Sequence, residues 1–118
     1  MLRFSAALGG IALTGWLLAF QQPAIAASGG ELKRLCAGSP GSRENELCGA
    51  YVLGVVSTMR YVNNSKTSTK PLACLPAAMS SGDMIAIAAR YLRENPLLMD
   101  RDAAELLAKA FGIAYPCS

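Results

Sequence analysis

Residues 48–56 read CGAYVLGVV, and this stretch decides how the rest of the chain must be arranged. Small or apolar residues recur there every three or four positions, and the pattern extends from Ser42 to Tyr61, which predicts a central amphipathic helix. The rest of the fold must cover one face of it. Gly49 and Gly54 each cost about 1 kcal/mol relative to alanine inside a helix, so their presence needs a reason. We expect a close approach at the face shared by Ala50 and Gly54. A tight crossing within the fold is the commoner cause, and a binding surface is the alternative.

The first 26 residues have the pattern of a secretory signal peptide. Arg3 supplies a positive start, residues 6–20 are almost all apolar, and the small residues of Ala24-Ile25-Ala26 form a cleavage signal. Cleavage after Ala26 would leave one domain, residues 27–118. The apolar run is shorter than the roughly 20 residues of a membrane span, although an uncleaved anchor is the alternative. No cysteine lies near the cleavage site, so lipid attachment is not supported, and no membrane association is expected after cleavage.

Four cysteines, Cys36, Cys48, Cys74 and Cys117, remain in that domain. They contain no C-x-x-C spacing, and the chain has no histidine, so disulfides are expected rather than a metal site. Three pairings are open. If the last two helices form an antiparallel hairpin, Cys74 and Cys117 meet at one end of it, which favours Cys74–Cys117 together with Cys36–Cys48.

The remaining pattern predicts an all-α fold, a small disulfide-stapled bundle of about four helices without strands. Helices are expected at residues 31–37, 42–61, 81–94 and 100–114, with 28–30 as a flexible lead. Ser42 and Ser81 are the expected caps of the second and third helices, and Asp100 and Asp102 open the last one. Residues 62–71 have no hydrophobic period and are expected to form a polar surface loop.

The composition excludes several functions. The formal net charge is +3, or +2 without Arg3, and the cations are scattered, so nucleic acid binding is not expected. Without histidine, Ser-His-Asp and Cys-His sites are excluded, and acid–base work would fall to carboxylates that lie at helix starts and on polar faces. A carboxylate pair acting on glycosides is a minor alternative. No catalytic residue, cofactor or metal ligand is therefore assigned, and a binding protein is expected rather than an enzyme.

Several short motifs occur in a fixed order along the mature chain, and together they resemble the Rap/Tai immunity proteins of type VI secretion systems. The motifs are a short cysteine-bearing helix, then Cys48-Gly49-x-Tyr51-Val52-x-Gly54-Val55, Cys74-x-Pro76, Tyr91-Leu92-x-x-Asn95-Pro96, Ala110-Phe111 and Pro116-Cys117. The resemblance implies a small, helical, disulfide-bonded periplasmic protein that binds and blocks a peptidoglycan amidase effector. An interaction domain of another role and a Hde-type acid-stress chaperone are the alternatives. The lack of histidine and the few carboxylates disfavour the chaperone.

An occluding inhibitor needs a contact that projects from the helical body. The polar loop is the candidate, and its expected partner-binding residues are Asn63, Asn64, Lys66 and Lys70. The lysines would meet acidic groups at the rim of the amidase cleft. The alternative is that the loop is an ordinary solvated connection. The small-residue face of the central helix would also suit a symmetric homodimer.

Overall fold

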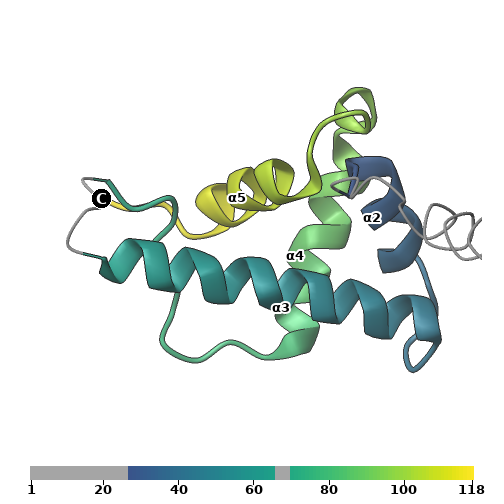
Figure 1. The fold of residues 1–118 in the computed structure, drawn as a ribbon, viewed down its shortest axis with the longest axis horizontal. Helices are drawn as coiled ribbons and strands as arrows, with labels where there is room; N and C mark the ends of the chain where they lie inside the picture. The colour runs from purple at the N-terminus through teal and green to yellow at the C-terminus, as the bar shows by residue number, and fades with distance from the viewer. Residues whose placement is uncertain (1–26, 66–69) are drawn as a thin grey trace, which may run out of the picture.

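The computed structural model describes residues 27–65 and 70–118. The expected signal peptide and Lys66 lie outside these residues. Within them the chain forms four α-helices and one short 3-10 helix, with no strand (Figure 1). The elements are α2 (Gly29–Cys36), α3 (Arg43–Asn64), α4 (Ser81–Glu94), η1 (Pro96–Leu98) and α5 (Ala103–Ala114). The predicted all-α class is confirmed.

The central helix α3 begins as the sequence predicts and ends later. The Ser42 side chain accepts a hydrogen bond from the Asn45 backbone N–H at 3.2 Å, so this residue is the N-cap. The helix then continues through Asn64 instead of ending at Tyr61. The predicted loop start at residue 62 is therefore wrong, because the side chain of Asn63 bonds to the segment that returns beside the helix. The buried residues of α3 are Cys48, Val52, Val56 and Met59.

The expected flexible lead at residues 28–30 is wrong, because these residues form the cap and first turn of α2. Ser28 and Glu31 make a capping box. The Gly29 N–H donates to the carbonyl of Arg101 at 2.9 Å, and the Gly30 N–H donates to that of Met99 at the same distance. A Cβ on Gly29 would lie 3.3 Å from the Met99 Cα and closer still to Leu106, so a glycine is required for this close approach.

The last two helices form where the sequence predicts them, with corrections at their ends, since α5 begins at Ala103 and not at residue 100. The cap of α4 is Ser80 rather than Ser81, because the Ser80 side chain accepts from the Asp83 N–H. At its other end the Asn95 side chain donates to the Tyr91 carbonyl at 2.8 Å, and η1 begins at the following proline. Asp102 caps α5 by accepting from the N–H groups of the second and third helical residues. The buried residues of these two helices are Met84, Ala88, Leu92, Ala103, Leu106, Leu107, Ala110 and Phe111.

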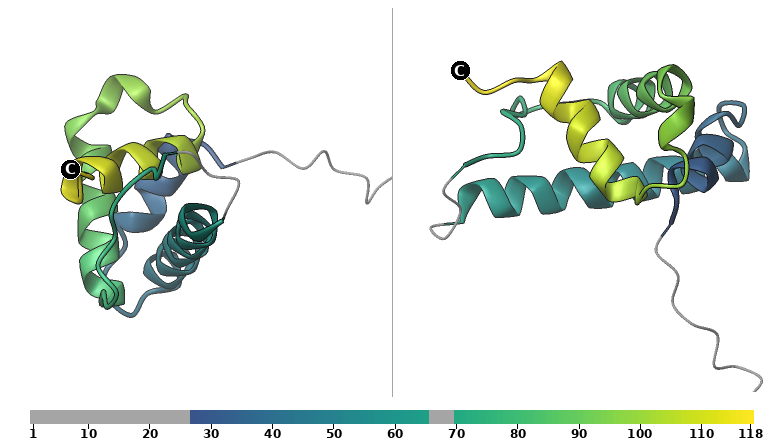
Figure 2. Two further views of the ribbon diagram at one scale, coloured as in Figure 1. Left: turned by 90° about the vertical axis from the view of Figure 1, so that its left-hand side faces the viewer. Right: turned by 90° about the horizontal axis from the view of Figure 1, so that it is seen from above.

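The longest helix, α3, runs the length of the described structure, and α2, α4 and α5 lie to one side of it (Figures 1 and 2). Every pair among these four helices is in contact. The largest fully buried side chains come from α2, α3, α4 and α5 together, so one core serves the whole domain. As a consequence, none of the described helices packs against the far side of α3.

Two disulfides close the fold, one between Cys36 and Cys48 and one between Cys74 and Cys117. The first joins the end of α2 to α3 within the core. The second joins the C-terminal end of the chain to the return segment, which we define as residues 70–80 between α3 and α4. These are the pairs that the hairpin argument favours.

Candidate functional site

An open apolar groove lies between α3 and α5. Its volume is about 510 Å³. The lining residues are Ala50, Tyr51, Gly54, Val55, Thr58, Met59, Val62, Leu72, Ala104 and Ala108. The groove is hollow because small residues face one another across it, Ala50 and Gly54 on α3 and Ala104 and Ala108 on α5. Most of its lining is carbon, so a ligand would be recognised by shape and apolar contact.

The two glycines of α3 have different environments. A Cβ on Gly49 would lie 3.3 Å from Cδ1 of Ile85, so this glycine allows α3 and α4 to approach closely. A Cβ on Gly54 would meet nothing within 4 Å. The expected tight internal crossing at the face of Ala50 and Gly54 is therefore wrong, because both residues are exposed and a Cβ on Gly54 would meet open space. The close approach of another helix lies at Gly49 instead.

The exposed face of α3 lacks the charges that a solvated helix normally carries. No charged residue occurs between Glu46 and Arg60. Large apolar side chains are exposed instead: the exposed fractions are 46% for Leu47, 49% for Leu53 and 77% for Tyr61. A helix face of this composition is typical of an interaction surface. The sequence contains a signal for this face. Residues 47–59 are uncharged, although only one face of the predicted helix has to be covered by the fold.

The apolar surface continues from α3 onto α5. Leu72, in the return segment, is 54% exposed and lines the groove beside α3. It also lines a second, more open groove of about 470 Å³ with Ala108, Gly112 and Ile113 of α5. Ile113 is 71% exposed. Leu72 and Ala108 thus join the two grooves into one apolar surface.

The polar residues that are predicted to bind a partner differ in their exposure to solvent. Asn63 is half-buried: its side-chain N–H group donates to the Ala73 carbonyl at 2.7 Å, and its side-chain oxygen accepts from the Leu72 N–H at 3.2 Å. It is therefore a structural residue, which corrects the expectation of a freely exposed contact. Asn64, in the last turn of α3, and Lys70, at the start of the return segment, are both exposed. These two flank the stretch that contains Lys66.

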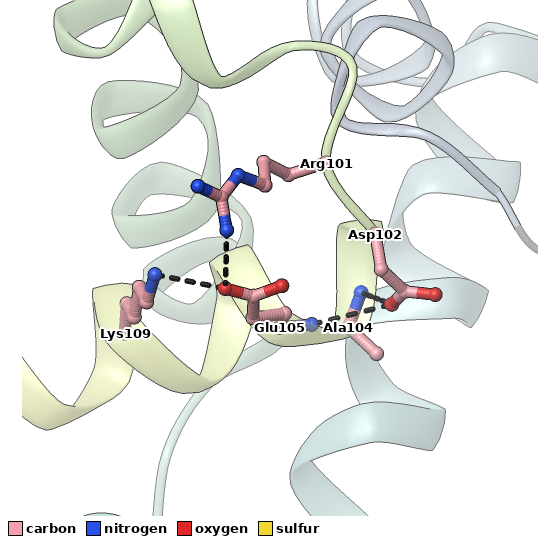
Figure 3. A network of polar contacts seen from close by, with 5 residues as sticks. All are labelled: Arg101, Asp102, Ala104, Glu105 and Lys109. Atoms are coloured by element: carbon pink, nitrogen blue, oxygen red, sulfur yellow. Dashed lines mark hydrogen bonds and ion pairs between the residues drawn. The ribbon is translucent and has the colours of Figure 1, made fainter.

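The ionisable groups of the described residues lie at the surface and form no buried cluster. All eight carboxylates are exposed. Glu105 is paired with Lys109 at 2.9 Å and with Arg101 at 3.6 Å (Figure 3). The hydrogen bond and charge of Lys109 lower the pKa of Glu105 below its usual value. In the groove, burial raises the pKa of Tyr51 above its usual value, and the charge of Asp102 acts in the same direction.

The described residues contain neither a metal-binding cluster nor a membrane-spanning helix. No three or more Cys, Asp or Glu side chains come close enough together to hold a metal ion. Among the same residues, no helix has both the length and the hydropathy to cross a membrane. What the described part of the chain offers to another molecule is an extended apolar surface.

Fold and surface together define a small, disulfide-bonded helical protein with an exposed apolar surface. The family model for Rap1a immunity proteins matches residues 28–117, which include all four cysteines. The chain therefore belongs to the Rap1a immunity protein family. No curated protein and no solved structure matches it.

Membership of this family implies an immunity protein against an effector of a type VI secretion system, and hence a protein partner. The family is typically non-enzymatic, and it suggests a secreted or periplasmic protein. Family membership therefore favours the role of an immunity protein over the two alternatives, an acid-stress chaperone and an interaction domain of another role.

Proposed function

We propose that this protein is a periplasmic inhibitor that binds and occludes a peptidoglycan amidase effector of a type VI secretion system. The family match over nearly the whole described domain carries the proposal. The amidase as target comes from the resemblance of the cysteine-bearing and helix-ending motifs. The two disulfides support the proposal, because such bonds persist in oxidising compartments such as the bacterial periplasm.

The proposed route to the periplasm is the signal peptide at residues 1–26. Cleavage after Ala26 would leave residues 27–118 as the active domain. The described fold supports this boundary, because the Ala27 carbonyl accepts a hydrogen bond from the Ala103 N–H at 2.9 Å. The first residue after the proposed cleavage site therefore already takes part in the domain. Mass spectrometry of protein isolated from the periplasm tests the boundary, and a mass that includes residues before Ala27 would contradict it.

The proposed amidase contact is the end of α3 and the connection that follows it. Asn64 and Lys70 are exposed there, and Lys66 lies between them in sequence. Lysines at this end would meet acidic groups at the rim of the amidase cleft, while the neighbouring Val62 and Leu72 would supply apolar contact area. Asn63 is assigned to holding the return segment and not to the contact itself.

Calorimetry with the cognate amidase and the 27–118 domain tests this arrangement. The triple variant Asn64→Ala, Lys66→Ala, Lys70→Ala should bind at least tenfold more weakly, a loss of about 1.4 kcal/mol. Asn63 is left intact so that the return segment stays in place, and an unchanged circular dichroism spectrum is the control. Unchanged affinity would move the site to the α3 groove, and failure of the wild type to bind any amidase effector would refute the proposed inhibitor.

The exposed face of α3 also supports a symmetric homodimer. Its outward residues Leu47, Ala50, Gly54, Thr58 and Tyr61 are spaced symmetrically about Gly54. An antiparallel pairing of two α3 helices about a two-fold axis would therefore place Leu47 of one chain against Tyr61 of the other, with the small residues between them.

Sedimentation measurements distinguish a dimer from a monomer. Gly54→Lys should shift the protein to a monomer, because it places a charge at the centre of the pairing. Ala86→Lys is the matched control, since Ala86 is exposed on α4. A monomeric wild type, or equal effects of both variants, would refute this dimer.

A further inference from the structure

The two disulfides of this fold differ in their exposure to solvent. Cys36 is 7% exposed and Cys48 is fully buried, and both belong to the hydrophobic core. Cys74 and Cys117 are both exposed. A thiolate must reach a sulfur atom to exchange with a disulfide, so access governs which bond reacts. Solvent access therefore favours attack at Cys74–Cys117.

The exposed bond fastens the return segment to the C-terminal end of the chain. The beginning of the return segment lies beside the C-terminal stretch, next to the end marked C in Figure 1. The Cys74 N–H also donates to the Tyr115 carbonyl at 2.9 Å. On its other side the segment is held by α3: the Arg60 guanidinium donates to the Pro76 carbonyl at 2.7 Å, and Asn63 bonds to the backbone of residues 72 and 73.

We infer that Cys74–Cys117 is a thiol–disulfide exchange site for an external dithiol, and that its opening loosens the return segment while the helical body stays folded. Cys74 shares the return segment with Lys70 and Leu72 of the proposed amidase contact, but the inference does not depend on that function.

The exchange proceeds in two balanced steps. In the first step, one thiolate of the dithiol attacks a sulfur of the Cys74–Cys117 bond, forms a mixed disulfide and releases the other cysteine as a thiolate, which takes a proton from water. In the second step, the remaining thiol of the reagent, as its thiolate, attacks the mixed disulfide. This attack releases the second cysteine and leaves the reagent as a cyclic disulfide. Two electrons pass from the dithiol to the protein.

Reduction should change the apolar surface before it changes the core. Leu72 lies in the return segment and lines both grooves. Neither Cys74 nor Cys117 belongs to the buried core, whereas Cys36 and Cys48 do. Opening the exposed bond therefore removes a covalent anchor from a wall of the grooves. The helices keep their own covalent anchor and their buried contacts.

Kinetics of reduction under native conditions test the inference directly. The wild-type domain is treated with dithiothreitol, quenched with iodoacetamide at intervals, and digested with trypsin. Arg43, Arg60 and Arg90 separate the four cysteines, so each falls in its own peptide. Labelling of Cys74 and Cys117 should be at least tenfold faster than labelling of Cys36 and Cys48. Equal rates, or earlier labelling of the buried pair, would overturn the inference.

Hydrogen exchange of the doubly labelled species tests the structural consequence. The amides of Leu72 and Cys74 should lose protection, because their bonds to Asn63 Oδ1 and to the Tyr115 carbonyl depend on the position of the return segment. Amides in the middle of α3 should keep theirs. Loss of α3 protection together with the first reduction would show global unfolding and would refute a local change.

A double variant provides an independent check that needs no reductant. Replacing Cys74 and Cys117 by serine should retain the helical circular dichroism of the wild type and should reproduce the exchange pattern of the reduced form. A wild-type pattern at Leu72 and Cys74 in this variant would contradict the proposed role of the bond.

Discussion

Replacing Gly54 by alanine should stabilise the domain, whereas the same change at Gly49 should gain less. Both glycines lie inside α3, where glycine costs about 0.8–1.0 kcal/mol relative to alanine. The added methyl group at Gly54 has open space, since nothing lies within 4 Å of its position. We therefore expect Gly54→Ala to raise the free energy of unfolding by about 0.5–1 kcal/mol, part of it through the unfolded chain.

At Gly49 the same helical gain is opposed by a close contact. The new Cβ would lie 3.3 Å from Cδ1 of Ile85, which is tighter than ordinary van der Waals contact. Ile85 is half-buried at the junction of α3 and α4, so its side chain must shift to make room. The benefit of Gly49→Ala should therefore be smaller than that of Gly54→Ala, and packing strain of about 1 kcal/mol would cancel it.

The assay is urea unfolding of the 27–118 domain, followed by the circular dichroism of its helices. For a domain of this size, a gain of 0.5–1 kcal/mol corresponds to a rise in melting temperature of about 2–8 °C. Measurements at low protein concentration keep any dimer from contributing. A neutral or destabilising Gly54→Ala, or a larger gain at Gly49, would refute the assignment of Gly54 to open space.

Three other changes test separate parts of the fold. Asn63→Ala should lower the free energy of unfolding by about 1–3 kcal/mol, because it removes two hydrogen bonds that hold the return segment. The exposed Asn64→Ala is its control and should stay within about 0.5 kcal/mol of the wild type in the same urea assay. Asp102→Ala should cost about 1 kcal/mol through loss of the α5 cap, and an unchanged urea midpoint would contradict that role. Glu105→Gln should be destabilising near neutral pH, and the difference should vanish as pH falls through the lowered carboxyl pKa. Lys109 lowers the pKa of Glu105 in the folded state, so the ionised carboxylate stabilises the fold at pH values above the unfolded-state pKa. This stabilisation is lost as pH falls through the lowered pKa. A difference in the free energy of unfolding between variant and wild type that persists in acid would refute this role of Glu105.

The helical core could be predicted from sequence because its signals are local. Ser42 and Asp102 are good caps at the right distance before an apolar stripe, and both act as caps in the structure. The buried stripe of α4 follows helical periodicity without interruption. The predicted cap of α4, Ser81, is one residue too late. Ser80 and Ser81 have the same side chain, so only the backbone conformation of the folded chain shows which of them is the cap.

The errors at the helix ends have a long-range cause. Gly29 and Gly30 have low helix propensity, which indicated a flexible lead, yet both donate hydrogen bonds to residues about seventy positions away. Asn63 was assigned to a loop because asparagine favours turns. In the structure it extends α3 by bonding to a segment that returns beside the helix. Neither partner is visible in a local window of the sequence.

The apolar surface depends on tertiary structure in the same way. Ala50 and Gly54 were recognised as a small-residue face, but whether another helix covers it depends on the position of α5. The structure places α5 at the edge of that face, so a groove remains. The contribution of Leu72 was not predictable, because it follows from the path of the return segment across the end of α5.

The hydrogen bonds that begin α2 impose an order on folding. A chain emerges from the ribosome with its N-terminus first, so residues 28–36 are available long before residues 99–103. The first-turn N–H groups of Gly29 and Gly30, however, bond to the carbonyls of Met99 and Arg101. Forming such distant contacts requires closing a long loop, which is slow relative to local helix formation. Among the described helices, the first to be synthesised can therefore be completed only after nearly the whole chain has been made, which is compatible with the proposed export of an unfolded chain.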